Sequence, residues 1–203
     1  MLFVPAKLRQ INRIVERGCW FEGWKVAGLR VRGLCFCLLL FAFFPDLRLV
    51  LLQLDFLQFE PALRISKSGD TTWVFDPIRR KQIVLTPEEM LRQLVLLYLL
   101  ETKKYPANRI RVEIGLLLNE RPKRCDIVVF DPHLNPWLVV ECKSPKVALS
   151  QATFEQAARY NLQFRAPFLA VTNGLATFSC ALDFEQSSFS FLEDFPEWEA
   201  GAV

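Results

Sequence analysis

The sequence predicts a mixed α/β fold, in which a β-sheet carries helices on its faces. Three observations predict it. Two helical patterns alternate with short runs of β-branched and aromatic residues. The runs at residues 125–131 and 137–143 are almost continuously apolar, as expected for central strands covered on both faces. The second helical pattern separates residues 137–143 from residues 167–174, so these two strands are expected to be parallel.

The first 53 residues differ in composition from the rest of the chain. Residues 1–33 hold seven Lys or Arg against two Glu, a net charge of +5, so the remainder carries −2 of the total +3. Eleven apolar residues follow, from Leu34 to Phe44, fewer than the roughly 20 that span a bilayer. Three interpretations stay open: a membrane-associating segment, a buried helix, or an extension outside the functional protein. We expect residues 1–53 to be an atypical extension and residues 54–203 to form the domain.

Composition also limits the classes of function. A slightly acidic body lacks the broad basic surface of proteins that hold nucleic acid by charge alone, so polyanion binding would need a local patch or metal ions. The six cysteines form no CxxC pair and His133 is the single histidine, which argues against structural zinc and a disulfide scaffold. We expect a reducing, cytoplasmic compartment and no small-molecule cofactor.

The first predicted element of the domain is a β-hairpin. Residues 71–76 and 82–85 are β-type runs joined by a turn at residues 77–81, which carries three basic residues. This basic tip could contact phosphate, or it could be an ordinary solvated turn.

A helix is predicted to follow the hairpin directly. Thr86 supplies an N-cap, Pro87 takes the first helical position and Glu89 stands where a capping-box glutamate would. The helix is expected to extend to about Lys104. Its buried stripe would consist of Leu91, Leu94, Val95 and Tyr98.

Three consecutive strands are predicted next, at residues 109–118, 125–131 and 137–143. Ser150 then begins a second helix, which extends to about Phe164. Two further strands are expected at residues 167–174 and 175–182. The aromatic tail, Phe189 to Trp198, is expected to pack against the sheet edge, with a subunit interface as the alternative.

Charged residues stand at one end of two neighbouring predicted strands. In a strand, alternate residues share a face, so Glu141 and Lys143 point the same way and Cys142 points to the other side. Antiparallel pairing with the preceding strand brings Asp126 opposite this end. Two neighbouring carboxylates repel unless a cation lies between them, and hard oxygen ligands suit Mg²⁺ or Mn²⁺. The lysine could steady an attacking water or the charge developing on a phosphate, as in phosphodiester cleavage.

The alternative is that these charges are ordinary solvated residues at a strand end. A polar pair at helical spacing on the next predicted helix, Gln156 and Tyr160, favours a functional site. Lys123 and Arg124 adjoin Asp126 and are candidates for phosphate contact. Glu113 could be a further acidic ligand or a strand-face charge, and His133 is interpreted as a solvated turn residue.

Asp126, fourteen intervening residues and then "ECK" resemble the PD-(D/E)xK nuclease signature. Gln156 and Tyr160 resemble an additional motif in the N-terminal nuclease domain of type I restriction enzyme R subunits, and residues 75–93 resemble the beginning of small stand-alone relatives of that domain. The resemblance covers about residues 54–197 and implies a restriction-endonuclease-like mixed β-sheet flanked by helices. Cys125 stands where the signature has its proline.

The resemblance also implies roles for individual residues. Asp126 and Glu141 would hold the metal with the Cys142 backbone carbonyl, and Lys143 would assist the attacking water. The auxiliary acidic position of the family would fall on Glu89, or less well on Glu88. Gln156 and Tyr160 would line the rim of the site that faces DNA.

Two functions of different class follow from the sequence. The first is a Mg²⁺-dependent DNA endonuclease without a helicase motor. The second is a non-catalytic nucleic-acid-binding or assembly module with the same fold. The expected partners are DNA, a second copy of the chain, since cutting both strands of a duplex usually needs two sites, and a restriction or repair protein that supplies specificity.

Overall fold

The computed structural model describes residues 52–118, 121–186 and 188–198; the side chains of residues 116–123 and of Gln151 lie outside the description. Nearly all of the predicted extension, including the apolar segment at residues 34–44, therefore lies outside the described residues. At its end, Leu52 exchanges two backbone hydrogen bonds of 2.8 Å with Thr177. Within the described ranges, no helix is both long enough and apolar enough to cross a membrane.

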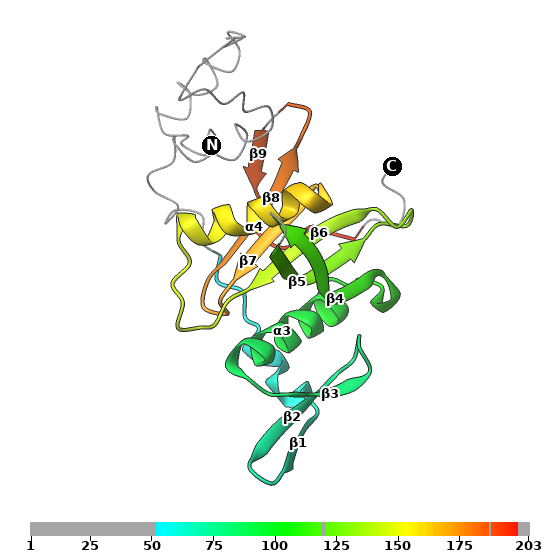
Figure 1. Cartoon of the computed structure of the whole chain (residues 1–203), viewed down its shortest axis with the longest axis vertical. Coiled ribbons are helices and arrows are strands. Elements are labelled where there is room, and N and C mark those ends of the chain that lie inside the picture. Colours follow the sequence, from blue (N-terminus) through cyan, green and yellow to red (C-terminus); the bar gives the residue numbers. More distant parts are fainter. Residues whose placement is uncertain (1–51, 119–120, 187, 199–203) are drawn as a thin grey trace. The chain divides into compact units, whose positions relative to one another are not determined.

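The main element of the fold is a six-stranded sheet (Figure 1), in the order β4-β5-β6-β7-β8-β9. Neighbouring strands are antiparallel except β6 and β7, which are parallel and are connected through helix α4, as predicted. The strands are β4 (Ile110–Leu118), β5 (Arg121–Phe130), β6 (Pro136–Cys142), β7 (Phe168–Thr172), β8 (Thr177–Asp183) and β9 (Ser188–Phe191).

A smaller antiparallel sheet precedes it, made by β1 (Ile65–Ser68), β2 (Thr71–Asp76) and β3 (Lys81–Val84). β2 and β3 are the predicted hairpin, with Trp73 opposite Val84. β1 was not predicted, because all four of its residues are exposed and its sequence shows no apolar alternation.

Two helices cover opposite faces of the large sheet (Figure 1). α3 (Pro87–Leu97) continues into a π-helical turn, η3 (Tyr98–Thr102), and packs on one face through Leu94 and Val95. α4 (Gln151–Phe164) packs on the other through Phe154 and Ala157. The predicted α3 stripe is buried, and its four members are at most 6% exposed. Two short 3-10 helices complete the elements, η2 (Leu57–Ala62) and η4 (Ala107–Arg109).

The beginnings of the two helices are capped differently. The Thr86 hydroxyl accepts a hydrogen bond from the Glu89 backbone N–H at 3.1 Å, so the predicted N-cap is present. The predicted capping box is wrong, because the Glu89 carboxylate accepts hydrogen bonds from other side chains. A capping box does begin α4, between Ser150 and Thr153.

Removing the α3 cap should destabilise the fold measurably. We expect Thr86→Ala to lower the free energy of unfolding by about 1 kcal/mol, because the Glu89 N–H loses its acceptor. Denaturant unfolding of the full chain checks this. Thr86→Ser keeps a hydroxyl and is the matched control; an equal loss in both variants would show that the hydroxyl does not stabilise the helix.

The C-terminal segment packs against the sheet edge, as expected, and then against the α3 side of the molecule. β9 pairs with β8, and beyond it Phe195 is buried in the core with α3. The Trp198 ring lies 5.1 Å from Trp137, centroid to centroid, and the Tyr105 hydroxyl donates to the Pro196 carbonyl at 2.6 Å. A mixed sheet with a helix on each face is the restriction-endonuclease-like architecture that the sequence predicts.

Candidate active site

The end of β6 brings the predicted acidic and basic residues together. Ile127 pairs with Val140, and the next residues toward this end of the two strands are Asp126 and Glu141, close enough for the charge of Asp126 to act on Glu141. The Cys142 backbone N–H donates to Asp126 Oδ2 at 2.7 Å. The ammonium of Lys143 lies 2.6 Å from Glu141 Oε1. Strand pairing alone therefore places two carboxylates and a lysine at one end of the sheet.

β5 is distorted where it carries Asp126. Cys125 packs in the α4-side core and Ile127 in the α3-side core, although residues two apart share a face in a regular strand. In the neighbouring β4, Glu113 has a φ of +52°, a conformation that few non-glycine residues adopt. The distortion lets the Asp126 carboxylate contact α3 as well as the end of β6.

Glu141 carries the most unusual electrostatics of the site. Glu141 is 6% exposed, and its Oε1 accepts a hydrogen bond from Lys143. Its Oε2 is buried and has no hydrogen-bond partner in the described structure. Burial, followed by the negative charge of Asp126, raises the pKa of Glu141 to about 7. A carboxylate held in this way favours any cation that can share the space beside Oε2.

Lys143 remains a cation at neutral pH. Burial lowers the pKa of its ammonium, but the hydrogen bond and charge of Glu141 outweigh burial, so the pKa is raised. The protonated side chain can stabilise negative charge on a phosphate and donate to a water, whereas it cannot act as a base that accepts a proton.

On the α3 side, Arg92 completes the surroundings of Asp126. Its Nη2 lies 2.8 Å from Asp126 Oδ1, and its Nη1 forms an ion pair with Glu89. Arg92 is 5% exposed, and its Nε lacks a partner in the described structure. Burial lowers the pKa of the guanidinium, but the negative charges of Asp126 and Glu89 raise it by more than burial lowers it. The guanidinium is therefore permanently charged. The sequence offered only the i,i+3 and i,i+4 spacings of Glu89 and Glu88 to Arg92 as a signal, and such helical pairs are usually solvated.

Arg79, from the β2–β3 turn, extends this network. Its guanidinium contacts Glu89 Oε1 at 2.8 Å and Asp76 Oδ2 at 2.6 Å, and it also pairs with Glu113. Arg79 therefore faces inward, whereas Arg80 and Lys81 remain exposed at the predicted basic tip.

Glu89 is placed near the site but not beside Glu141. The Arg92 guanidinium lies between Glu89 and Asp126, since it contacts both carboxylates. Glu89 also accepts a hydrogen bond from Gln93 at 2.8 Å. Its contact with Asp126 is thus indirect.

The predicted DNA-contacting residues divide by exposure. Tyr160 is 5% exposed, so the structure places it in the interior, and its contact with DNA stays a prediction. Its hydroxyl accepts from the half-buried Gln156 amide at 2.8 Å, and it lies close enough to Lys143 to contribute to the raised pKa of that ammonium. The side chain of Arg124 is 72% exposed and lies 4.0 Å from Glu113. The side chain of Lys123 lies outside the described residues.

Two other predicted features have plain outcomes. His133 is exposed in the turn between β5 and β6, as interpreted from the sequence. The Cys142 thiol is buried on the α3 side, where burial raises its pKa, so this residue can offer the site only its backbone.

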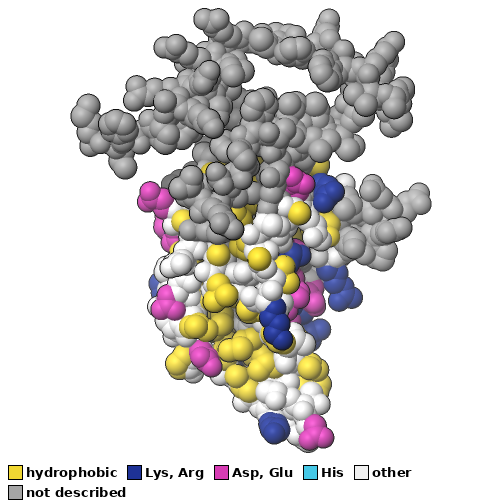
Figure 2. Space-filling model, turned by 90° about the vertical axis from the view of Figure 1, so that its left-hand side faces the viewer, with side chains coloured by type: hydrophobic (Ala, Val, Ile, Leu, Met, Phe, Trp, Pro, Cys, Tyr) yellow, Lys and Arg dark blue, Asp and Glu magenta, His cyan; other side chains and the backbone are white. Residues whose placement is uncertain are grey.

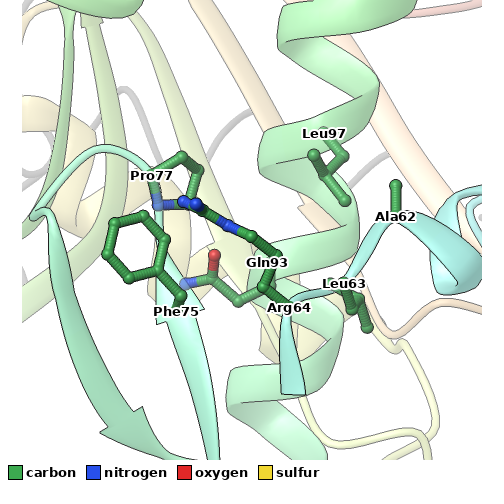
Figure 3. A pocket seen from close by; sticks show the side chains of 7 residues that line it. All are labelled: Ala62, Leu63, Arg64, Phe75, Pro77, Gln93 and Leu97. Carbon is green, nitrogen blue, oxygen red and sulfur yellow. The ribbon is translucent and has the colours of Figure 1, made fainter. Parts of the chain in front are cut away.

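A small cavity lies beside the network (Figure 3), between β2, α3 and the segment before β1. Its volume is about 50 Å³, enough for a few waters and far below the size of a typical ligand site. Two of the residues that line it are in contact, since the Arg64 guanidinium lies 3.7 Å from the centroid of the Phe75 ring. Gln93 lines the cavity and donates to Asp76 at 3.0 Å, so the cavity borders the ion pairs without entering them.

The connected groups carry an excess of negative charge. Among the described residues, six carboxylates face four cations; the carboxylates are Asp76, Glu88, Glu89, Glu113, Asp126 and Glu141, and the cations are Arg79, Arg92, Arg124 and Lys143. A divalent cation would balance this charge. In the part of the chain that the structure describes, no three His, Cys, Asp or Glu side chains form a metal-binding group, so a metal here would depend on two carboxylates and backbone or water oxygens.

These features define a class of protein: a restriction-endonuclease-like domain with two carboxylates and a lysine at one end of a central strand. The chain belongs to the family described as type I restriction enzyme R protein N terminus, whose model matches residues 87–196, more than half of the 203 residues. The match begins at the first residue of α3 and includes Asp126, Glu141 and Lys143. No curated protein matches the chain.

Proposed function

We propose that this chain is a Mg²⁺-dependent DNA endonuclease that hydrolyses phosphodiester bonds, with Mn²⁺ able to replace Mg²⁺. The observation that carries the proposal is the buried Glu141 Oε2, which has no hydrogen-bond partner among the described residues and lies beside a second buried carboxylate. Leaving a charged oxygen without a partner is costly in a protein interior. A hard cation at this place would remove that cost, and the oxygen donors present fit Mg²⁺.

The residues would divide the work as follows. Asp126 and Glu141 would hold the metal together with the Cys142 carbonyl. When bound, the metal supplies Lewis acidity toward the phosphate and lowers the pKa of bound water. Lys143 stabilises the negative charge that develops on the phosphate, because its ammonium stays protonated beside Glu141. On α4, Gln156 donates a hydrogen bond to the Tyr160 hydroxyl, and Tyr160 lies near Lys143 and helps to keep its ammonium protonated.

Membership of the restriction enzyme family supports DNA as the substrate. The exposed Arg80, Lys81 and Arg124, and by prediction Lys123, would contact the DNA backbone. On the face drawn in Figure 2, Lys and Arg side chains gather along one side and hydrophobic ones occupy the middle. A local basic border of this kind suits a protein that contacts the phosphate backbone of DNA. We propose that the protein acts in the cytoplasm. We propose that a second copy, or a restriction or repair subunit, supplies the second cut and the specificity.

One observation favours the alternative of a non-catalytic nucleic-acid-binding or assembly module. Arg92 already neutralises Asp126 through a 2.8 Å ion pair, so this carboxylate is satisfied by the protein itself. In such a module Asp126 would be a purely structural residue.

A plasmid-nicking assay with the full chain separates the two functions. We expect supercoiled DNA to be nicked with Mg²⁺ or Mn²⁺ and not with EDTA. Lys143→Met should lower the rate at least about 100-fold, because the only ammonium described beside Glu141 is lost.

Lys146→Met is the matched control, since Lys146 is exposed in the loop after β6, three residues further along. This variant should keep at least half of the wild-type rate. No nicking with either metal would favour the non-catalytic alternative, whereas equal rates for wild type and Lys143→Met would show that Lys143 has no part in the reaction.

A further inference from the structure

The Arg92 guanidinium occupies the position of a counter-ion beside a candidate metal ligand. It is buried, it contacts Asp126 Oδ1 at 2.8 Å, and it reaches the site from α3 rather than from the sheet. Asp126 Oδ2 accepts the Cys142 N–H. Both oxygens of Asp126 therefore have a partner from the protein, while Glu141 Oε2 has none in the described structure.

We propose that Arg92 is the counter-ion of Asp126 in the metal-free protein and that a divalent cation displaces it, so that Arg92 sets the metal affinity of the site. The inference rests on the proposed metal site and adds to it a competitor supplied by the chain.

The surroundings of Arg92 allow it to release Asp126 without becoming unpaired. The same Nη2 that contacts Asp126 lies 3.6 Å from Glu88 Oε1, and Nη1 lies 3.8 Å from Glu113 Oε1. The Glu88 side chain is 49% exposed and can move toward the guanidinium. Glu89 keeps its own ion pair with Nη1. Arg92 can thus exchange Asp126 for Glu88 with a small movement along α3.

Electrostatics gives the direction of the effect. A guanidinium within a few ångströms of a divalent cation repels it, and this repulsion is weakly screened at a site as buried as Asp126. Removing the positive charge should therefore strengthen metal binding. A purely structural Arg92 predicts the opposite, since Asp126 would lose the group that positions it.

Mn²⁺ binding to the full chain tests the inference, with the free ion measured by electron paramagnetic resonance. We expect Arg92→Met to bind Mn²⁺ at least about tenfold more tightly than wild type. We expect Arg92→Lys, which keeps the charge, to stay within about threefold of wild type. An affinity of Arg92→Met that equals or falls below that of wild type would overturn the proposal.

Thermal unfolding in EDTA identifies changes that come only from lost stability. Lys103→Met is the matched control, because Lys103 is another buried cation paired with two carboxylates, Asp194 and Glu197. We expect both Lys103→Met and Arg92→Met to lower the unfolding temperature, and Lys103→Met to leave the Mn²⁺ affinity unchanged.

Glu88→Gln keeps the proposal testable if Arg92→Met does not fold. Glu88 is half exposed, so its variant should fold, and loss of the acceptor for Arg92 should weaken Mn²⁺ binding about threefold. In an Arg92→Lys background the weakening should be smaller, since the shorter ammonium reaches Glu88 less well. No effect of Glu88→Gln in the wild-type background would count against the exchange.

The outcomes also distinguish this inference from the proposed function. Wild type that binds Mn²⁺ through Asp126 but nicks no DNA would end the nuclease proposal and leave the Arg92 inference standing. If wild type nicks DNA and Arg92→Met binds Mn²⁺ as tightly as wild type does, the nuclease proposal would stand and the Arg92 inference would be overturned. Absence of Mn²⁺ binding in both wild type and Arg92→Met would overturn both.

Discussion

Asp126→Asn is expected to lower DNA nicking at least about 1,000-fold, equivalent to about 4 kcal/mol of transition-state stabilisation. The amide keeps the shape of the side chain but removes the charge that would hold a metal. It also presents an NH₂ group to one of two donors, the Arg92 guanidinium or the Cys142 N–H, at distances of 2.8 and 2.7 Å. Nicking rates and Mn²⁺ binding, measured on the same preparation, check the prediction.

Asp194→Asn is the matched control for this change. Asp194 is likewise a carboxylate in a hydrogen-bonded ion pair, with the Tyr98 hydroxyl at 2.8 Å and Lys103 at 3.1 Å. It should cost stability without changing the nicking rate per folded molecule. If both variants lose the same activity, the loss reflects folding and Asp126 has no special role.

The second large effect is a dependence of stability on pH. The pKa of Glu141 is about 7 in the folded protein, because of burial and then Asp126, against 4.5 for an ordinary glutamate. The folded state thus binds this proton more tightly than the unfolded chain. Between pH about 4.5 and about 7 the metal-free protein should lose up to about 3 kcal/mol of unfolding free energy as pH rises. Denaturant unfolding in EDTA across this range measures the loss.

Two comparisons assign this slope to Glu141. Glu141→Gln has no proton to release, so its unfolding free energy should change much less over the same interval. Saturating Mg²⁺ should flatten the slope of the wild type, because the ion compensates the carboxylate that forms as pH rises. A wild-type slope that persists unchanged in Glu141→Gln would place the titrating group elsewhere.

The strands of the large sheet could be predicted because their burial is encoded along the chain. Val128 and Val139 belong to nearly continuous apolar runs, and both are buried where β5 and β6 pair. The parallel pairing of β6 and β7 followed from the intervening helix. β1 escaped prediction because all four of its residues are exposed and show no apolar alternation. β9 was expected only as part of a segment packed at the sheet edge, since its four residues are fewer than a strand pattern usually needs, although serine and phenylalanine alternate along it.

Only the part of the candidate site that lies on the large sheet could be predicted from the sequence. Asp126, Glu141 and Lys143 meet through strand register, which the spacing of the sequence determines. The part formed by α3 and the β2–β3 turn depends on long side chains that contact residues far away in the sequence. Arg92 and Asp126 are 34 positions apart, and so are Arg79 and Glu113. No local pattern encodes such contacts.

Glu89 shows how a local rule can mislead. Its spacing from Thr86 fits a capping box, and the Thr86 half of that motif is present. The carboxylate itself is drawn to Arg79, Arg92 and Gln93, which offer charged or buried donors in place of a solvated backbone N–H. Charge-assisted pairing is stronger than the capping interaction, so tertiary contacts decide the outcome.

The β2–β3 turn has a consequence for how domain boundaries are drawn in this family. The family match begins at Pro87, yet Arg79, which precedes it, forms one ion pair with Glu89 inside the match and another with Asp76 before it. A protein shortened to the matched region would lose the ion pairs of Arg79 with Glu89 and Glu113, so that these two carboxylates would depend on Arg92, with only Gln93 and the exposed Arg124 as further described partners. Relatives that lack a cation at the position of Arg79 should therefore also lack one of these glutamates, a covariation that an alignment of homologues can reveal.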